Sequence, residues 1–164
     1  MSEPGLERFV LRPAALGDLP AVSSTLIAAG VEAWGPWLDA ERIASQTTQE
    51  HEWLAAGGLV VADDAQGVVA GFVRFDVAAD GTGWIDLLYT HPRAWGHGAG
   101  RALLAHGTGA LRDAGCPCAL LFTEERNARA RGVYEAAGFR LDGEVRERDW
   151  HGARLRELRY RLAL

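Results

Sequence analysis

A glycine-rich turn between a predicted strand and a predicted helix constrains the fold of this chain more than any other feature. The stretch HPRAWGHGAGRALL covers residues 91–104 and places Gly96, Gly98 and Gly100 at every second position. Glycine allows positive φ and close approach of the backbone to a ligand. The unpaired N–H groups and the dipole at a helix N-terminus favour an anion. The stretch therefore predicts either a phosphate-binding turn or a tight strand-to-helix turn that binds nothing.

Hairpins and helices precede this turn. Residues 8–14 read as a first strand, and Asp18 is expected to cap a helix over 19–34. The GPWL segment ends that helix, and Asp39 opens a second one that runs to Gly57–Gly58. Turn signals then separate three strands that we expect to follow one another by hairpins, at 59–63, 68–79 and 84–90.

Helices and strands alternate after the turn. The helix that starts there extends to about Ala114, and the wholly apolar segment 118–123 is typical of a strand inside a sheet. Asn127 begins another helix that Gly138 stops. Two final strands, 139–150 and 153–164, flank a turn at His151–Gly152. The order predicts an α/β (α+β) fold with about four helices on a mixed, mostly antiparallel sheet of about seven strands.

Composition excludes several classes of protein. The chain has 164 residues, which suits one domain over 1–164, and 48% of them are hydrophobic. The apolar runs are far shorter than the ~20 residues of a membrane helix, and the first ten residues carry no apolar block, so we expect a cytoplasmic protein that does not act at a membrane. A net charge of −5 argues against nucleic acid as a partner. Cys116 and Cys118 are expected to be reduced thiols, and no metal site is predicted.

The familiar nucleotide-binding loops do not explain the glycines. A Walker loop requires lysine, and all 17 basic residues of this chain are arginines. A dinucleotide-binding unit places its glycines after the first strand of a βαβ series, whereas here they follow the fourth strand. Because arginine is the only basic residue used, any single arginine is weak evidence for an anion site.

The glycine stretch and a second segment together resemble one family. The run LLYTHPRAWGHGAGRALL is similar to the acyl-CoA diphosphate loop of the GCN5-related N-acetyltransferases, usually written Gln/Arg-x-x-Gly-x-Gly/Ala. The run NARARGVYEAAGF, residues 127–139, resembles their Asn-x-x-Ala…Tyr-x-x-x-Gly-Phe signature. The predicted order of elements agrees with that family over nearly the whole chain. The resemblance implies two splayed parallel central strands, here 84–90 and 118–123, with acetyl-CoA bound between them.

The resemblance assigns residues to the cofactor. The backbone of the fourth strand would pair with the pantetheine arm as an added strand does, and the turn would hold the diphosphate. Asn127 would bond the pantetheine region, or serve only as a helix N-cap. The implied cofactor-binding residues are Leu88, Tyr89, Thr90, Gly96, His97, Gly98, Ala99, Gly100, Arg101, Asn127 and Tyr134.

One position departs from the family pattern. The leading Gln/Arg of the loop falls on Trp95, which puts the anchoring side-chain contact in doubt but not the backbone N–H groups. A tryptophan there can also simply pack beneath the turn.

Two residues are the predicted catalytic groups. Tyr134 lies two helical turns after Asn127 and, as the resemblance implies, would protonate the departing CoA thiolate; the other interpretation is a core tyrosine. The family's frequent glutamate base falls on Trp84, and Asp86, two residues on and on the same face of the strand, is the leading substitute. Asp86 could instead hold the substrate ammonium or pair with Arg74. Four other residues stay open as the base: Glu124 and Glu125, both of which we expect to be solvated, and the histidines His91 and His97.

The acceptor side is less defined by sequence. Trp34, Arg74 and Trp84 are predicted to contribute to a pocket for an apolar or cationic amine, although most tryptophans are expected in the core. The predicted function is transfer of an acetyl group from acetyl-CoA directly to a primary amine of a small molecule or a peptide N-terminus. A non-catalytic acyl-CoA sensor and a purely structural domain are the competing hypotheses. A homodimer through the C-terminal strands is possible.

Overall fold

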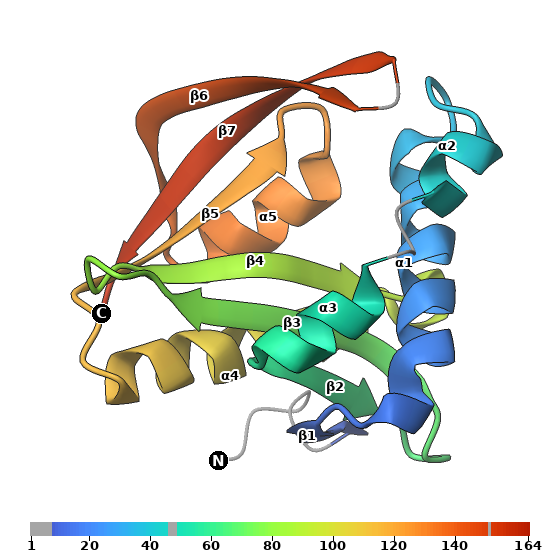
Figure 1. The fold of residues 1–164 in the computed structure, drawn as a ribbon, viewed down its shortest axis with the longest axis horizontal. Helices are drawn as coiled ribbons and strands as arrows, with labels where there is room; N and C mark the ends of the chain where they lie inside the picture. Colours follow the sequence, from blue (N-terminus) through green and yellow to red (C-terminus); the bar gives the residue numbers. More distant parts are fainter. Residues whose placement is uncertain (1–7, 46–48, 151) are drawn as a thin grey trace. The chain divides into compact units, whose positions relative to one another are not determined.

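The structure, a computed structural model, describes residues 8–45, 49–150 and 152–164 (Figure 1). Seven strands form one sheet in the order β1-β2-β3-β4-β5-β7-β6. Parallel pairing joins β4 and β5, and the other pairs with known register are antiparallel. The strands are β1 (Val10–Pro13), β2 (Leu59–Asp63), β3 (Val69–Val77), β4 (Gly83–Thr90), β5 (Cys118–Glu124), β6 (Arg140–Trp150) and β7 (Ala153–Ala163). The helices are α1 (Leu19–Trp34), α2 (Ala40–Ala44), α3 (Glu50–Ala56), α4 (Ala99–Asp113) and α5 (Ala128–Ala136).

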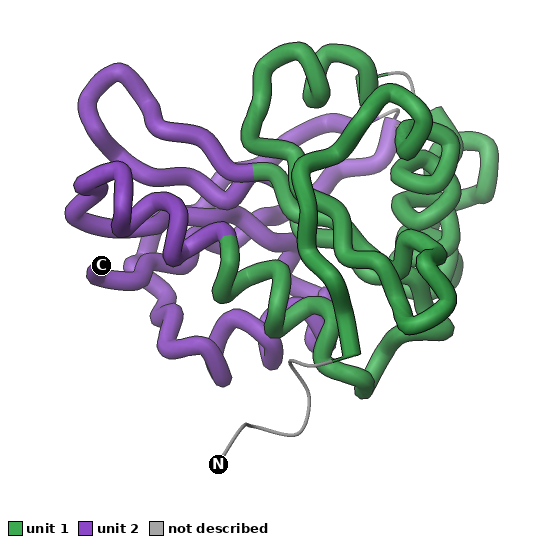
Figure 2. The backbone as a smooth tube through the Cα atoms, turned by 90° about the horizontal axis from the view of Figure 1, so that it is seen from below, with its two compact units in different colours: residues 1–74, 87–106 green, residues 75–86, 107–164 purple. Residues whose placement is uncertain are grey.

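The chain divides into two compact units (Figure 2). The first comprises residues 1–74 and 87–106, and the second comprises 75–86 and 107–164. The divisions fall inside β3, β4 and α4, so neither unit is a continuous segment of the sequence. We describe each unit by itself.

The core of the first unit lies between α1 and the strands β2 and β3. Leucine and valine side chains of α1 at helical spacing pack against the inward side chains of both strands, as the periodicity predicted. Phe72 is fully buried in this cluster, and Leu87 and Tyr89 of β4 pack against it. The fully or nearly fully buried members are Leu19, Val22, Leu26, Leu59, Val61 and Phe72.

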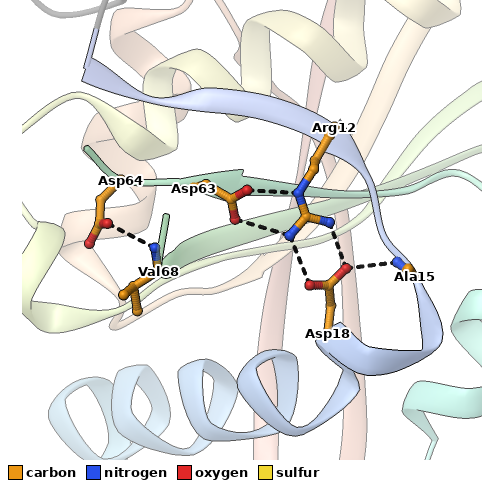
Figure 3. Close-up of polar contacts among 6 residues, drawn as sticks. All are labelled: Arg12, Ala15, Asp18, Asp63, Asp64 and Val68. Carbon is orange, nitrogen blue, oxygen red and sulfur yellow. Dashed lines mark hydrogen bonds and ion pairs between the residues drawn. The ribbon is translucent and has the colours of Figure 1, made fainter. Parts of the chain in front are cut away.

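A guanidinium between two carboxylates joins β1 to its neighbours (Figure 3). Arg12 donates to Asp63 on β2 and, through both terminal nitrogens, to Asp18 at 2.7 and 2.9 Å. Asp18 also accepts the backbone N–H of Ala15 at 2.8 Å. Asp18 does stand at the predicted N-cap position of α1, which begins at Leu19, but its side chain makes no cap hydrogen bond and instead accepts from Arg12 and Ala15.

The predicted second helix is two short helices. Asp39 does begin it, accepting the N–H of Arg42 at 2.8 Å. However, α2 ends at Ala44, the hydroxyl of its C-cap residue Ser45 donates to the carbonyl of Arg42 at 2.6 Å, and α3 starts only at Glu50. A serine that bonds a carbonyl three residues back competes with helix continuation. Residues 46–48 lie outside the described part of the chain, as do residues 1–7 and the His151 position of the predicted final turn.

The second unit is built on β5 and the long β6–β7 hairpin. β5 is buried along nearly its whole length, as its apolar sequence predicted. It pairs in parallel with β4, Gly83 with Ala119 and Trp84 with Leu120, and antiparallel with β7 over its full length. Helix α5 packs on this sheet through Tyr134, whose ring lies 6.0 Å from that of Tyr160 on β7.

No helix among the described residues is long and apolar enough to cross a membrane. Cys116 and Cys118 are buried free thiols.

Candidate active site

Two of the three glycines in the turn have the positive φ that the sequence predicted, and the third, Gly100, lies within α4. Gly96 has φ 78° and Gly98 has φ 92°, in the left-handed region that favours glycine. The amide of Ala102 donates to the carbonyl of Gly98 at 3.0 Å, so the helical bonding of α4 starts at Gly98. The N–H groups of residues 99–101 precede that bond and have no acceptor within the helix. The turn thus presents a helix N-terminus immediately after two left-handed glycines.

Trp95 fastens this turn to the end of β4. Its indole Nε1 donates to the carbonyl of Thr90 at 3.0 Å. Its backbone N–H donates to the carbonyl of Pro92 at 3.1 Å and closes a short 3-10 turn over Pro92–Ala94. The predicted packing role beneath the turn therefore comes with a specific hydrogen bond. One consequence is that Thr90, expected to offer its backbone to the pantetheine arm, already accepts one donor on its carbonyl.

Both histidines near the turn, His91 and His97, have hydrogen-bond partners. The backbone N–H of His97 donates to the carbonyl of Ala94 at 3.2 Å, so this amide has a partner besides any anion. The His97 side chain is exposed, and its Nδ1 lies 3.4 Å from a terminal nitrogen of Arg8. His91 accepts the N–H of Arg93 on Nδ1, and burial, followed by the charge of Arg93, lowers the pKa of His91. His91 is therefore held neutral more strongly than an ordinary histidine.

Close packing at Gly71 fixes the beginning of α4. A Cβ placed on Gly71 of β3 would lie 2.9 Å from Leu103 Cδ1 on α4, Thr90 Cγ2 and the carbonyl oxygen of Tyr89. No side chain fits there without movement of its neighbours. Ala99 is buried, whereas Arg101 is exposed in the first turn of α4. The first unit thus holds the helix N-terminus rigidly and leaves Arg101 on the surface.

Asn127 and Tyr134 lie at the two ends of α5 in the second unit. Asn127 Oδ1 accepts the N–H of Ala130 at 3.2 Å, which confirms the predicted N-cap. Tyr134 is only 6% exposed, and its ring packs against Phe139 and Tyr160. The ring of Tyr134 therefore lies in the core, and its role as a general acid stays a prediction.

Asp86 is an exposed residue of β4, two positions from Trp84 on the same face of the strand. The ring of Trp84 stacks on Phe122 of β5 with centroids 5.9 Å apart. The guanidinium of Arg146 lies 3.9 Å from the centre of the same Phe122 ring. Trp84, Phe122 and Arg146 thus form a flat stack from three strands, which the sequence alone did not indicate.

Two buried carboxylates lie opposite one another on β5 and β7. Glu124 and Glu157 face each other in the register, and they are 5% and 7% exposed. Glu124 accepts the backbone N–H and the Nε of Arg126, both at 2.8 Å. The expectation that Glu124 is solvated was wrong, because the apolar strand carries it into the sheet where an arginine satisfies it. Glu125, half-buried, pairs with Arg156 at 2.7 Å.

Glu157 is a buried residue that sequence reasoning missed. It accepts from Arg146 Nε at 2.5 Å and from Arg148 at 3.1 Å. Glu157 lies two residues after Leu155 and therefore on the same face of the strand. Only this spacing could have indicated that Glu157 points inward.

The remaining predicted acceptor residues lie in the first unit. Trp34 is 7% exposed and meets the ring of Tyr89 edge-on at 6.4 Å. Arg74 ends the first unit's part of β3, opposite Leu59, and is half-buried. Trp34 is thus mainly a core residue, as most of the chain's tryptophans were expected to be. In the described parts of the chain, no three His, Cys, Asp or Glu side chains gather as a metal site.

The turn fits a diphosphate by its own geometry. A Cβ built on Gly96 meets nothing within 4 Å, so space lies open beside that backbone. The adjacent helix N-terminus and Arg101 supply N–H donors and a positive charge.

One family model matches more than half of the chain. The sequence model of the "Acetyltransferase (GNAT) family" matches residues 27–139. A mycothiol acetyltransferase of Saccharopolyspora erythraea is 32% identical over 98 residues, which are 59% of this chain and 32% of that protein. The chain spans about a third of the length of such curated relatives.

Solved structures share the fold over nearly the whole chain. A GCN5-related N-acetyltransferase from Rhodopseudomonas palustris superposes with a TM-score of 0.80 at 18% identity, covering 96% of both chains. The PaiA N-acetyltransferase of Thermoplasma acidophilum, in complex with coenzyme A, has a TM-score of 0.76 at 15% identity and covers 95% of this chain and 99% of its own. The fold is thus that of the acetyltransferases. The chain belongs to the GNAT acetyltransferase family.

Proposed function

We propose that this protein transfers an acetyl group from acetyl-CoA directly to a primary amine of a small molecule or a peptide N-terminus. The observation that carries the proposal is the pair of left-handed glycines, Gly96 and Gly98, immediately before the N-terminus of α4. Family membership supports the acetyltransferase class, and a fold neighbour in complex with coenzyme A supports the donor. The acceptor amine is our inference.

The first unit would hold the donor. Acetyl-CoA supplies an activated acyl thioester. The N–H groups from Gly96 to Arg101 would bind its diphosphate, and Arg101 would add a charge-assisted contact. The backbone of Leu88, Tyr89 and Thr90 would bond the pantetheine arm, with the Thr90 carbonyl shared with Trp95. The backbone N–H of His97 already donates to the carbonyl of Ala94, so it would bind the diphosphate through a hydrogen bond shared between the two acceptors.

The second unit would supply the proton transfers. The phenol oxygen of Tyr134 would give its proton to the leaving sulfur, whose pKa of ~8.5, judged from cysteine, suits a phenol as general acid. Asn127 would bond the pantetheine region with its amide nitrogen, since Oδ1 is used by the helix cap. Asp86 would take the proton of the acceptor ammonium, directly or through water. Trp84 and Arg74 would contact the acceptor.

Two measurements test the proposal. Thermal unfolding with saturating acetyl-CoA or CoA is expected to raise the Tm, because a ligand that binds only the folded state stabilises it. Thiol release from acetyl-CoA is then followed with a panel of amino acids, polyamines, peptides and, because of the relatives' name, mycothiol-type acceptors. An unchanged Tm would refute donor binding. A raised Tm with no acceptor-dependent thiol release would instead indicate an acyl-CoA sensor.

A further inference from the structure

Helix α5 presents three polar residues on the face that it turns toward β7. Arg131, Tyr134 and Glu135 stand three and four residues apart, so their side chains share one side of the helix. All three approach one residue of β7, Tyr160. Tyr160 is fully buried and is among the largest buried side chains of the described chain.

The hydroxyl of Tyr160 joins the two charged residues of this face. It accepts a hydrogen bond from Arg131 Nε at 2.9 Å and donates one to Glu135 Oε1 at 2.6 Å. Arg131 is itself fixed, because its NH1 donates to the carbonyl of Glu125 at 3.1 Å. The NH2 of Arg131 and Oε1 of Glu135 are 3.9 Å apart, so the phenol hydroxyl bridges the two members of a wide ion pair. The arrangement sets both the rotation of α5 and its distance from β7.

The ring of Tyr160 meets the ring of Tyr134. Their centroids are 6.0 Å apart with an interplanar angle of 48°, and Phe139 contacts Tyr134 at 6.2 Å. Phe139 is also tied to Tyr134 through its backbone N–H, which donates to the Tyr134 carbonyl at 3.0 Å. The buried rings of Tyr160 on β7 and of Phe139, just before β6, therefore restrict how the Tyr134 side chain can turn.

We propose that Tyr160 is a positioning residue that fixes the phenol of Tyr134, through ring packing and through the hydrogen bonds that hold α5. This inference rests on the proposed function, in which Tyr134 is the general acid. A phenol that donates a proton must be held within hydrogen-bond reach of the leaving atom, and small displacements lower the rate steeply.

The protonation of Tyr160 suits this role. Burial, with a smaller effect of Glu135, raises the pKa of Tyr160 despite the opposing effect of Arg131. In the described part of the chain, the charged groups that bond its hydroxyl are Arg131 and Glu135 of α5. The residues in register with it on β5 and β6 are Leu121 and Leu141. The Tyr160 hydroxyl therefore keeps its proton, and its donor bond to Glu135, to a higher pH than an ordinary tyrosine would.

A double-mutant cycle tests the proposal. Tyr160→Phe keeps the ring and removes both hydrogen bonds of the hydroxyl. We expect kcat to fall about five- to tenfold in the otherwise unchanged protein, but less than about twofold in a Tyr134→Phe background, because a positioning residue acts only through the group that it positions. KM for acetyl-CoA is expected to stay within about twofold. Equal fold losses in both backgrounds would overturn the inference.

Two variants of Glu135 supply an independent measurement if Tyr160→Phe does not fold. Glu135 is half-exposed, so Glu135→Leu removes the acceptor without disturbing the core. Glu135→Leu is expected to lower kcat, as Tyr160→Phe does, and to move the alkaline limb of the pH profile of kcat by about half a pH unit. Glu135→Gln keeps an oxygen acceptor and should restore most of the rate. Arg154→Gln, which breaks the exposed pair with Glu147 near the tip of the hairpin, is the control that should leave kcat unchanged.

The failure of this inference and of the proposed function are distinguishable. If Tyr134→Phe leaves turnover unchanged over the whole pH range, the acid role of Tyr134 is wrong and the inference falls with it. If Tyr134→Phe slows turnover while Tyr160→Phe and Glu135→Leu do not, only the positioning role of Tyr160 is wrong.

Discussion

The indole nitrogen of Trp95 donates to the carbonyl oxygen of Thr90 across 3.0 Å. Thr90 is the last residue of β4 and Trp95 directly precedes the first left-handed glycine, so one side chain joins the strand to the turn. In the family pattern this position carries glutamine or arginine. Here a neutral donor joins the strand end to the turn that carries Gly96 and Gly98.

Replacing Trp95 tests this connection. Trp95→Phe keeps an aromatic ring but removes the donor, which costs about 1 kcal/mol of hydrogen bonding at a part-buried site. We expect the Kd for acetyl-CoA to rise about threefold to tenfold, measured by calorimetry, because the turn loses its fixed position. Trp53→Phe, which changes an aromatic ring stacked on Phe72 in the same unit, is the control and should leave the Kd unchanged. An unaltered Kd in Trp95→Phe would show that the bond does not support the turn.

The left-handed glycines can be tested with a matched pair. Gly98→Val and Gly67→Val each force a side chain into positive φ, 92° and 75°, and each is expected to cost about 1–3 kcal/mol of stability. Gly67 lies in the β2–β3 turn, outside the proposed cradle. Only Gly98→Val should weaken acetyl-CoA binding, by at least about tenfold in titrations of the folded variants. Equal affinity in a folded Gly98→Val protein would refute the diphosphate cradle.

Tyr134 is tested by removing one oxygen. Tyr134→Phe preserves the packing against Phe139 and Tyr160 but leaves no proton for the leaving sulfur. We expect kcat to fall about 100-fold, the lower range for loss of a general acid, with the acetyl-CoA Kd and the Tm nearly unchanged. Steady-state rates over the full pH range, with calorimetry at one pH, provide the measurement. A large increase in Kd without a change in kcat would assign Tyr134 to binding instead.

Asp86 is tested through the pH dependence of the rate. Asp86→Asn removes the proposed proton acceptor, so we expect turnover to fall about tenfold or more near neutral pH. The deficit should shrink at alkaline pH, because the acceptor amine then loses its proton to solvent. Asp76→Asn removes a carboxylate from another exposed position of the second unit and serves as control. A pH profile of Asp86→Asn parallel to that of the unmodified protein would dismiss Asp86 as the base.

The hydrogen bonds between Arg12 and Asp18 predict that the free energy of unfolding falls at acid pH. Hydrogen bonds from Arg12, opposed by burial and aided by the Ala15 N–H, lower the pKa of Asp18 below its usual 3.8. A lowered folded-state pKa means that the stabilisation is complete above the unfolded value and is lost as the pH falls through the folded value. Asp18→Asn should therefore lower the free energy of unfolding by about 1 kcal/mol at pH 7, and the difference should disappear as the pH falls through the folded-state pKa of Asp18, which lies below 3.8. Urea titrations at several pH values measure it, and a constant difference down to pH 2 would contradict the assignment.

Much of the fold followed from local patterns. The order of strands and helices, the glycine turn before α4, the cap at Asn127 and the buried β5 were all predicted, because periodicity, turn chemistry and capping depend on residues within a few positions of one another. The single long helix after Asp39 failed because Ser45 bonds a carbonyl of α2 and ends it. The side-chain cap at Asp18 failed because Arg12 and Ala15 take the same carboxylate.

The sequence by itself determined that this chain has a glycine turn at a helix N-terminus and an Asn–Tyr helix after a buried strand, and the resemblance of both segments to the GNAT family indicated acetyl-CoA as the cofactor. Tertiary structure alone decided which groups those motifs contact. Cross-strand register buries Glu124 opposite Glu157, 33 positions away by residue number, and brings Tyr160 beneath Tyr134. The physical reason is that a side chain's partners depend on which strands become neighbours and on the rotamer that packing allows, and neither is encoded in short-range spacing.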